Sequence, residues 1–146
     1  MSPVLRGIGV WSPSAEALMM GTAAVESQMG RYLHQVGGPA LGVMQMEPAT
    51  HNDIIKNYLM HRQLLWRDVV QATGVDGVRL RNLTTNLAYA VAMARLHYLR
   101  VPEPLPKHDD IVGLGSYWKE HYNTHLGKGT VDKFVDSYHQ LVEGNQ

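Results

Sequence analysis

The chain has 146 residues, of which 45% are hydrophobic and 18% charged, a balance typical of one soluble globular domain over 1–146. Its 13 Lys and Arg equal its 13 Asp and Glu, so charge does not indicate nucleic-acid binding, and the absence of Cys excludes zinc-ribbon, thiol-nucleophile and disulfide sites. No run of 18 apolar residues and no basic region followed by an apolar core occurs, so we expect neither a membrane span nor a secretory signal peptide.

The first predicted helix covers about 13–29. Ser12 is a suitable N-cap, and Pro13 suits the first helical position because the N–H that it lacks would be unpaired there anyway. Gly30 is a suitable terminator. The helix therefore places Glu26 in its last turn.

A long loop and four further helices are expected after this helix. The loop covers 31–50 and can include a short β-hairpin, because the segment is rich in residues that break helices, namely Gly37, Gly38, Pro39, Gly42 and Pro48. We expect the helices over 50–66 or 50–71, over 82–100 or 84–100, over 109–124 and over 130–142, separated by a turn at 73–77 and an extended connector at 101–106. The chain is therefore predicted to be mainly α.

Glu26 is the only charged residue in the stretch GTAAVESQMG, positions 21–30. It lies at the edge of the apolar stripe of the first helix and near the negative end of the helix dipole. Burial and the dipole both disfavour the ionised carboxylate, so both raise its pKa. An acid that stays protonated near neutral pH can protonate a glycosidic oxygen. The alternative is a Glu at the stripe's edge whose carboxylate lies in solvent.

Two sequence blocks carry a family resemblance: VES at 25–27 and GPALGVMQMEPAT at 38–50. Their order and the 19-residue gap from Glu26 to Gln45 resemble the signature of lytic transglycosylases and goose-type lysozymes. The matching positions are Glu26, Ser27, Gly42, Val43, Met44, Gln45, Pro48 and Thr50. The segment 86–99 also resembles a family helix that begins Asn-Ile.

The resemblance implies a lysozyme-like fold in which Glu26 is the general acid and base. It implies that Ser27, Met44 and Gln45 lie at the sugar-binding groove, and that Tyr117 binds substrate or orients Glu26. Each has a structural alternative: Ser27 can bond to the backbone near the helix end, Met44 can pack in the core, and Tyr117 can be a core aromatic residue.

One later segment departs from the family pattern, which expects Ala-Tyr-Asn-Ala-Gly after that helix. The chain has GLGSYWKEHYNTHLGKG, in which Tyr117 is the better positional match but Trp118 stands where Asn is expected. The pair Tyr122-Asn123 has the right residues, yet the next glycine, Gly127, comes too late.

Other kinds of site are weakly supported or excluded. His121 and His125 share a helix face, but the intervening residues lack the Glu of the zinc-protease motif and no third ligand is spaced to match, so we expect no metal and no cofactor. GKG lacks the context of a P-loop, and no serine has an elbow signature. Glu47 is the only other carboxylate in the signature loop and is a candidate general base for hydrolysis, or a solvated loop residue.

The sequence therefore predicts a lytic transglycosylase that cleaves peptidoglycan glycan strands between N-acetylmuramic acid and N-acetylglucosamine. Without a signal peptide, delivery to the periplasm would fall to a bacteriophage, either in the virion or as an endolysin released at lysis. The alternative is a non-catalytic virion or tail protein on the same scaffold, which binds the wall or other virion proteins, since fold does not fix function.

Overall fold

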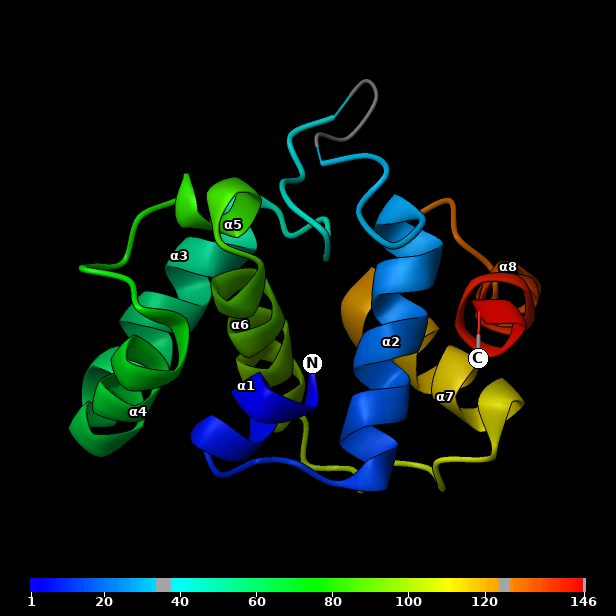
Figure 1. The fold of residues 1–146 in the computed structure, drawn as a ribbon, viewed down its shortest axis with the longest axis horizontal. Coiled ribbons are helices and arrows are strands. Elements are labelled where there is room, and N and C mark those ends of the chain that lie inside the picture. Colours follow the sequence, from blue (N-terminus) through cyan, green and yellow to red (C-terminus); the bar gives the residue numbers. More distant parts are fainter. Residues whose placement is uncertain (34–37, 124–126, 146) are drawn as a thin grey trace.

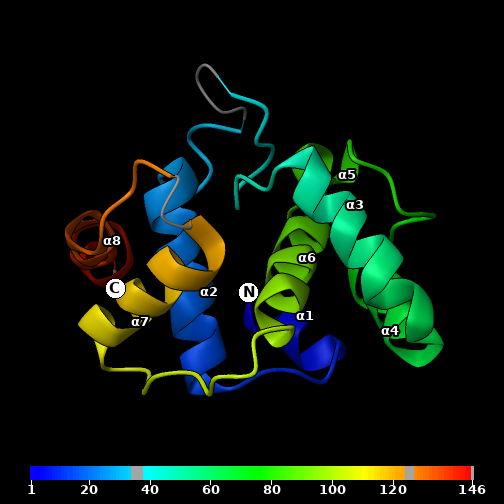
Figure 2. The same cartoon turned by 180° about the vertical axis from the view of Figure 1, so that it is seen from behind.

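The computed structural model describes residues 1–33, 38–123 and 127–145, and the structure is mainly helical. Figures 1 and 2 show helices α3 to α6 on one side of the molecule and α2, α7 and α8 on the other, with the long connection between α2 and α3 at one end. The prediction of a mainly α chain is confirmed.

The first two helices lie at the start of the chain. Helix α1, Ser2–Gly7, was not predicted and buries Leu5. Helix α2, Pro13–Ser27, begins as predicted, with the Ser12 hydroxyl accepting a 3.0 Å hydrogen bond from the Ala15 N–H. It ends two residues before the predicted Met29, because Gln28 and Met29 adopt left-handed backbone angles (φ 52° and 61°).

The connection between α2 and α3 contains one closed turn rather than a β-hairpin. Leu41 and Met46 form a single antiparallel bridge, with each N–H donating to the other residue's carbonyl at 2.9 and 3.0 Å. The possible hairpin thus reduces to one bridge within the described part of this loop. Four residues of the predicted loop, 34–37, lie outside the described residues.

The predicted long helix from Thr50 is two helices. Helix α3, Pro48–Asn57, begins at Pro48 and is followed by a short 3-10 turn, Leu59–His61, and by α4, Gln63–Thr73. Tyr58 and Arg62 leave helical geometry (φ −133° and −135°), and the turn buries Leu59 against the core. Tertiary packing therefore breaks a segment that contains no Gly or Pro between Thr50 and Thr73.

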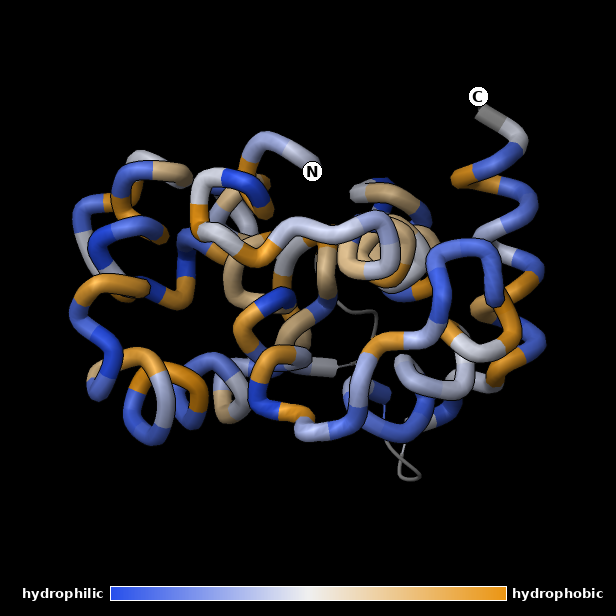
Figure 3. The backbone as a smooth tube through the Cα atoms, turned by 90° about the horizontal axis from the view of Figure 1, so that it is seen from below, coloured by the Kyte–Doolittle hydropathy of each residue, from blue (hydrophilic) through white to orange (hydrophobic). Residues whose placement is uncertain are grey.

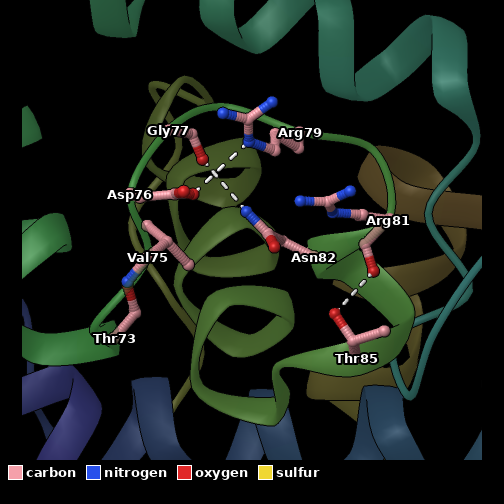
Figure 4. A network of polar contacts seen from close by, with 8 residues as sticks. All are labelled: Thr73, Val75, Asp76, Gly77, Arg79, Arg81, Asn82 and Thr85. Carbon is pink, nitrogen blue, oxygen red and sulfur yellow. Dashed lines mark hydrogen bonds and ion pairs between the residues drawn. The ribbon is translucent and has the colours of Figure 1, made fainter.

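A polar turn connects α4 to the central helix (Figure 4). Asp76 pairs with Arg79 at 3.3 Å, and the Asn82 amide donates to the Gly77 carbonyl at 3.0 Å. The turn leads into α5, Asn82–Thr85, and then α6, Leu87–Leu99. The N-cap of α6 is Asn86, whose side chain accepts from the Tyr89 N–H at 2.9 Å, rather than the predicted Asn82 or Thr84.

The C-terminal third forms the other side of the molecule. After the extended connector, α7 covers Ile111–Trp118 with Asp110 as N-cap, and a π-helical turn, Lys119–Asn123, continues it. Helix α8, Val131–Ser137, begins at the predicted cap Thr130, and a π-helical turn, Tyr138–Val142, and a 3-10 turn, Glu143–Asn145, follow. The predicted end of the α7 segment, Thr124, lies outside the described residues.

Two hydrophobic clusters meet at α6. The first cluster joins α2, α7 and α8 to one face of α6 and includes Leu18, Ala24, Leu114, Trp118 and Phe134. The second cluster joins α3, α4 and α5 to the other face and includes Ile54, Val69, Leu83 and Met93. The segment that ends at the C-terminus is amphipathic, as its alternating colours show in Figure 3.

No helix in the described ranges combines the length and the apolar character that crossing a bilayer requires.

Candidate active site

A cavity of about 450 Å³ opens between the two groups of helices. Its wall combines residues from the end of α2, the α2–α3 connection, the start of α3, α6 and the segment that follows α7. They are Glu26, Gly38, Pro39, Ala40, Gln45, Met46, Glu47, Thr50, His97, Tyr122, Asn123, Gly127 and Lys128. The volume lies within the range of small-molecule sites.

Glu26 is in the last turn of α2 and is largely buried at the cavity wall. Burial raises the pKa of its carboxyl from 4.5 to about 7, although a hydrogen bond from Trp118 acts in the opposite direction. The Trp118 indole Nε1–H donates that bond to Oε2 at 3.0 Å. At neutral pH a substantial fraction of Glu26 is therefore protonated, as a general acid must be.

Two neutral tyrosines lie close to Glu26: Tyr98 is buried and Tyr122 is half-buried. Burial raises the pKa of Tyr98 and of Tyr122 well above 10, and the nearby Glu26 carboxylate raises both further. Tyr122 lines the cavity, and its hydroxyl donates to the Met44 carbonyl at 2.5 Å. Their neutral phenols add no positive charge that would lower the pKa of Glu26.

Gln45 lines the cavity, as predicted for a substrate-binding residue. Its side-chain amide donates to the carbonyls of Tyr32 (3.1 Å) and Gly42 (2.9 Å), and its backbone adopts φ 46°. The two N–H groups are thus used to hold the turn, while the amide oxygen remains as an acceptor.

Ser27 and Met44, both predicted to lie at the sugar-binding groove, are not part of the cavity lining. Ser27 is fully buried and does not line the cavity; its hydroxyl contacts the carbonyls of Ala23 and Val43 and accepts from the Gly30 N–H at 2.8 Å. The Met44 side chain is packed in the first cluster, 1% exposed. Both positions match the structural alternatives: Ser27 bonds to the backbone near the helix end, and Met44 packs in the core. These contacts hold the turn after α2.

Tyr117 is also placed differently from the prediction. Its hydroxyl donates to the Glu103 carbonyl at 2.9 Å, and the residue does not line the cavity. Trp118 makes the hydrogen bond to Glu26 that was expected of Tyr117, and Tyr122 takes the place at the cavity wall. Trp118 and Tyr122 are four residues apart and so share one helical face, whereas Tyr117 lies on another.

A charged network supports the cavity wall at α6. Asp53 accepts from Arg100 at 2.6 Å, and Arg100 in turn donates to His97 Nδ1 at 2.8 Å. Burial and the adjacent Arg100 cation lower the pKa of His97 to about 4, so its imidazole is neutral. The His97 ring then packs edge-on against the Tyr122 ring at 5.3 Å and fixes that tyrosine against the cavity.

The remaining charged residues at the cavity are Glu47 and Lys128, both exposed. Within the described ranges, no group of three or more His, Asp or Glu side chains could hold a metal ion. His125, one half of the pair weighed as a metal motif, lies outside the described residues, and His121 instead lies 3.8 Å from Glu103 and 3.7 Å from Glu120.

Trp118 and His97 were not predicted as site residues, and Tyr122 was named only as part of the pair Tyr122-Asn123. The four-residue spacing of Trp118 and Tyr122 indicates that they share a face, but the sequence alone does not say which face meets Glu26. His97 gave no signal, since one His on an apolar helix is most simply a core residue.

Comparison with family models, with curated proteins and with solved structures finds no match for this chain. The function is therefore inferred from the chemistry of the cavity and from the sequence signature that surrounds it.

Proposed function

We propose that the protein is a peptidoglycan lytic transglycosylase with a lysozyme-like fold, in which Glu26 is the general acid and base. The observation that carries the proposal is the Glu26 carboxyl itself. It lies at the wall of a cavity of about 450 Å³, and burial raises its pKa to about 7. A carboxylic acid in this state can protonate the oxygen between two sugars at neutral pH.

The proposed reaction needs one carboxyl group. Glu26 gives its proton to the glycosidic oxygen between N-acetylmuramic acid and N-acetylglucosamine as that bond breaks. The Glu26 carboxylate then takes the proton of the C6 hydroxyl of the muramic acid, whose oxygen attacks the anomeric carbon. The products are a free hydroxyl on the leaving sugar and a 1,6-anhydro ring, and Glu26 regains its proton.

The state of the cavity favours an enzyme over a non-catalytic wall-binding or virion protein. A cavity filled by the large side chain of Trp118 would leave no room for a sugar beside Glu26. Trp118 is instead 1% exposed within the first cluster, and the cavity lies open above the carboxyl that it contacts. In this proposal a bacteriophage virion or a lysis pathway delivers the enzyme to the wall.

Glu47 supports a second outcome of the same cleavage. It is exposed and lines the cavity together with Glu26. If Glu47 activates a water molecule, the product is a reducing sugar rather than an anhydro sugar. The identity of the product therefore separates the lyase from the hydrolase.

Mass spectrometry of the products released from purified Gram-negative sacculi tests the proposal. We expect wild-type protein to release anhydro-muropeptides and Glu26→Gln, which keeps the shape of the side chain but cannot donate the acidic proton, to release at least 100-fold less, roughly the contribution of a general acid. Glu47→Gln is the matched control at the same cavity and should keep the activity of a lyase.

Reducing-end products that disappear in Glu47→Gln would establish the hydrolase. Release of nothing by folded wild-type protein, checked by circular dichroism, would overturn the enzymatic proposal in favour of the wall-binding or virion protein.

A further inference from the structure

The two carboxyl oxygens of Glu26 have different surroundings. Oε2 accepts the 3.0 Å hydrogen bond from the Trp118 indole N–H. Within the described part of the chain, no group donates a hydrogen bond to Oε1. Arg100 Nε is the buried side-chain atom that lacks a partner there, and Oε1 is not such an atom. Because Glu26 lines the cavity and its Oε2 is turned to the buried Trp118 indole, Oε1 is the oxygen left for the cavity.

An indole N–H differs from other polar aromatic groups because it can only donate a hydrogen bond. A hydroxyl opposite Oε2 could donate to the ionised carboxylate and accept from the protonated acid, so it would leave the proton free to sit on either oxygen. When Glu26 is protonated, its carbonyl oxygen is a stronger acceptor for the Trp118 N–H than its hydroxyl oxygen. The contact therefore favours Oε2 as the carbonyl oxygen and places the acidic proton on Oε1.

The two phenols near Glu26 donate their protons to other groups. The Thr22 hydroxyl donates to the Leu18 carbonyl at 2.7 Å, so in its 2.9 Å contact with Tyr98 the Tyr98 hydroxyl is the donor. The Tyr122 hydroxyl donates to the Met44 carbonyl. Of these three aromatic groups, only Trp118 has a proton for Glu26.

The Trp118 ring is held in this position from several sides. It is 1% exposed and packs against the Phe134 ring at a centroid distance of 5.6 Å. A Cβ atom at Gly129 would lie 2.4 Å from the far edge of the indole, so only glycine leaves space for the ring there. A ring held by Phe134 and at its far edge presents its N–H in one direction at little further entropic cost.

We propose that Trp118 is a positioning residue that places the acidic proton of Glu26 on Oε1, on the cavity side of the carboxyl. This proposal rests on the proposed function of Glu26 as a proton donor. The same N–H then stabilises the carboxylate that remains after the proton has been transferred, so Trp118 acts at both stages through one contact.

Other titratable groups around Glu26 do not provide this placement. Tyr98 and Tyr122 stay neutral and donate elsewhere, and His97, also at the cavity wall, accepts from Arg100 and is neutral near pH 7. Glu47 and Lys128 line the cavity and are exposed, and no hydrogen bond joins either side chain to Glu26 among the described residues.

The first test uses wild-type protein and needs no activity. In 15N–1H NMR spectra we expect the indole signal of Trp118 to move with a midpoint near pH 7, and to stay at a hydrogen-bonded position below that pH. Glu26→Gln should hold this signal at its low-pH position, because the Gln carbonyl replaces Oε2. An indole signal that ignores the ionisation of Glu26, or takes the position of a free indole at low pH, would overturn the proposal.

The second test removes the donor and keeps an aromatic ring at position 118. In Trp118→Phe we expect the pKa of Glu26, measured by 13C NMR of its carboxyl carbon, to rise by about 1, since a hydrogen bond to the charged form has been lost. We expect kcat on peptidoglycan to fall about tenfold with KM unchanged, and the basic limb of the pH profile to move upward by the same amount as the pKa.

Trp11 offers a matched control, because its indole N–H also donates to a carboxylate, Glu16 Oε2 at 3.3 Å, away from the cavity. Trp11→Phe should change neither the pKa of Glu26 nor kcat. An unchanged pKa and pH profile in folded Trp118→Phe would refute the positioning role. Inactive wild-type protein would refute the proposed function alone, since the NMR titration would still report the contact.

Discussion

The raised pKa of Glu26, which suits a proton donor, lowers the stability of the folded protein at neutral pH. Its pKa is about 7 in the folded protein and 4.5 in an ordinary solvated chain, because the surrounding first cluster excludes water from the charged form. Below pH 4.5 both states are protonated and the difference has no effect on stability. Between pH 4.5 and about 7 the carboxyl ionises in the unfolded chain but stays largely protonated in the folded protein, so the free energy of unfolding falls. Above about pH 7 the carboxyl is ionised in both states, and the free energy of unfolding falls no further.

Glu26→Gln should remove this pH-dependent loss. A difference of about 2.5 in pKa corresponds to about 3 kcal/mol, so the variant should gain about that much in free energy of unfolding, relative to wild type, between pH 4 and pH 8. Urea denaturation of both proteins at the two pH values measures the gain. Glu47→Gln serves as the exposed control. If Glu26→Gln gained the same free energy of unfolding over wild type at both pH values, Glu26 would not have a raised pKa in the folded protein.

Gly42 shows how the α2–α3 connection is fixed against the rest of the protein. Its φ is 81°, and a Cβ atom there would lie 1.8 Å from the Leu83 carbonyl oxygen in α5. The backbone of the connection can approach α5 this closely only without a side chain. The same turn holds Gln45 at the cavity, so the polar turn that precedes α5 supports the site indirectly (Figure 4).

Gly42→Ala should therefore lower the free energy of unfolding by about 3 kcal/mol or more, from backbone strain plus steric overlap. Gly74→Ala is the matched control: Gly74 has φ 74°, but no atom lies within 4 Å of its Cβ position, so only the left-handed backbone costs energy, about 1 kcal/mol. Chemical denaturation measures both variants. Equal losses in free energy of unfolding for the two variants would show that the backbone near Leu83 moves to accommodate the new Cβ atom at little energetic cost.

At the scale of the whole molecule, α6 joins the two clusters. Ala90, Val91, Ala94 and Tyr98 pack in the first cluster, and Tyr89, Ala92, Met93 and Leu96 pack in the second. A helix that is apolar all round is a buried helix, and in Figures 1 and 2 α6 lies on the inner side of its group, next to α2. We therefore expect the two sides to unfold in one cooperative transition.

Phe134→Ala tests this coupling from the far end of the chain. A Cβ atom at Gly21 of α2 would lie 2.2 Å from the Phe134 ring, and one at Gly115 of α7 would lie 3.1 Å from it, so the ring joins α8 to both helices. Its loss should cost about 3–5 kcal/mol. Val112→Ala, at a position 59% exposed on α7, should change stability by less than about 0.5 kcal/mol.

Urea unfolding of Phe134→Ala should give one transition with the same midpoint by circular dichroism and by tryptophan fluorescence. Two separate transitions would show that the clusters fold independently despite the shared helix.

Local chemistry was enough to predict a large part of the fold. Ser12 followed by Pro13 marks the start of α2, and Thr130 marks the start of α8, because a side-chain oxygen satisfies N–H groups that have no helical partner. The same reasoning placed Glu26 in the last turn of α2, beside apolar residues. Its raised pKa could be predicted, because burial raises the pKa of a carboxyl whichever residues surround it.

Only the tertiary structure decided which partners Glu26 has. The residues 117–122 form two pairs at four-residue spacing: Trp118 with Tyr122, and Tyr117 with His121, whose rings meet edge-on at 4.6 Å. Helical periodicity defines the pairs, but the rotation of the helix that packs on α2 determines which pair faces the cavity. The break at Tyr58 has the same origin: no local signal marks it, and the burial of Leu59 sets it. The sequence by itself thus determined the starts of α2 and α8, the apolar stripe and the acid. Long-range packing determined the groups that surround the acid.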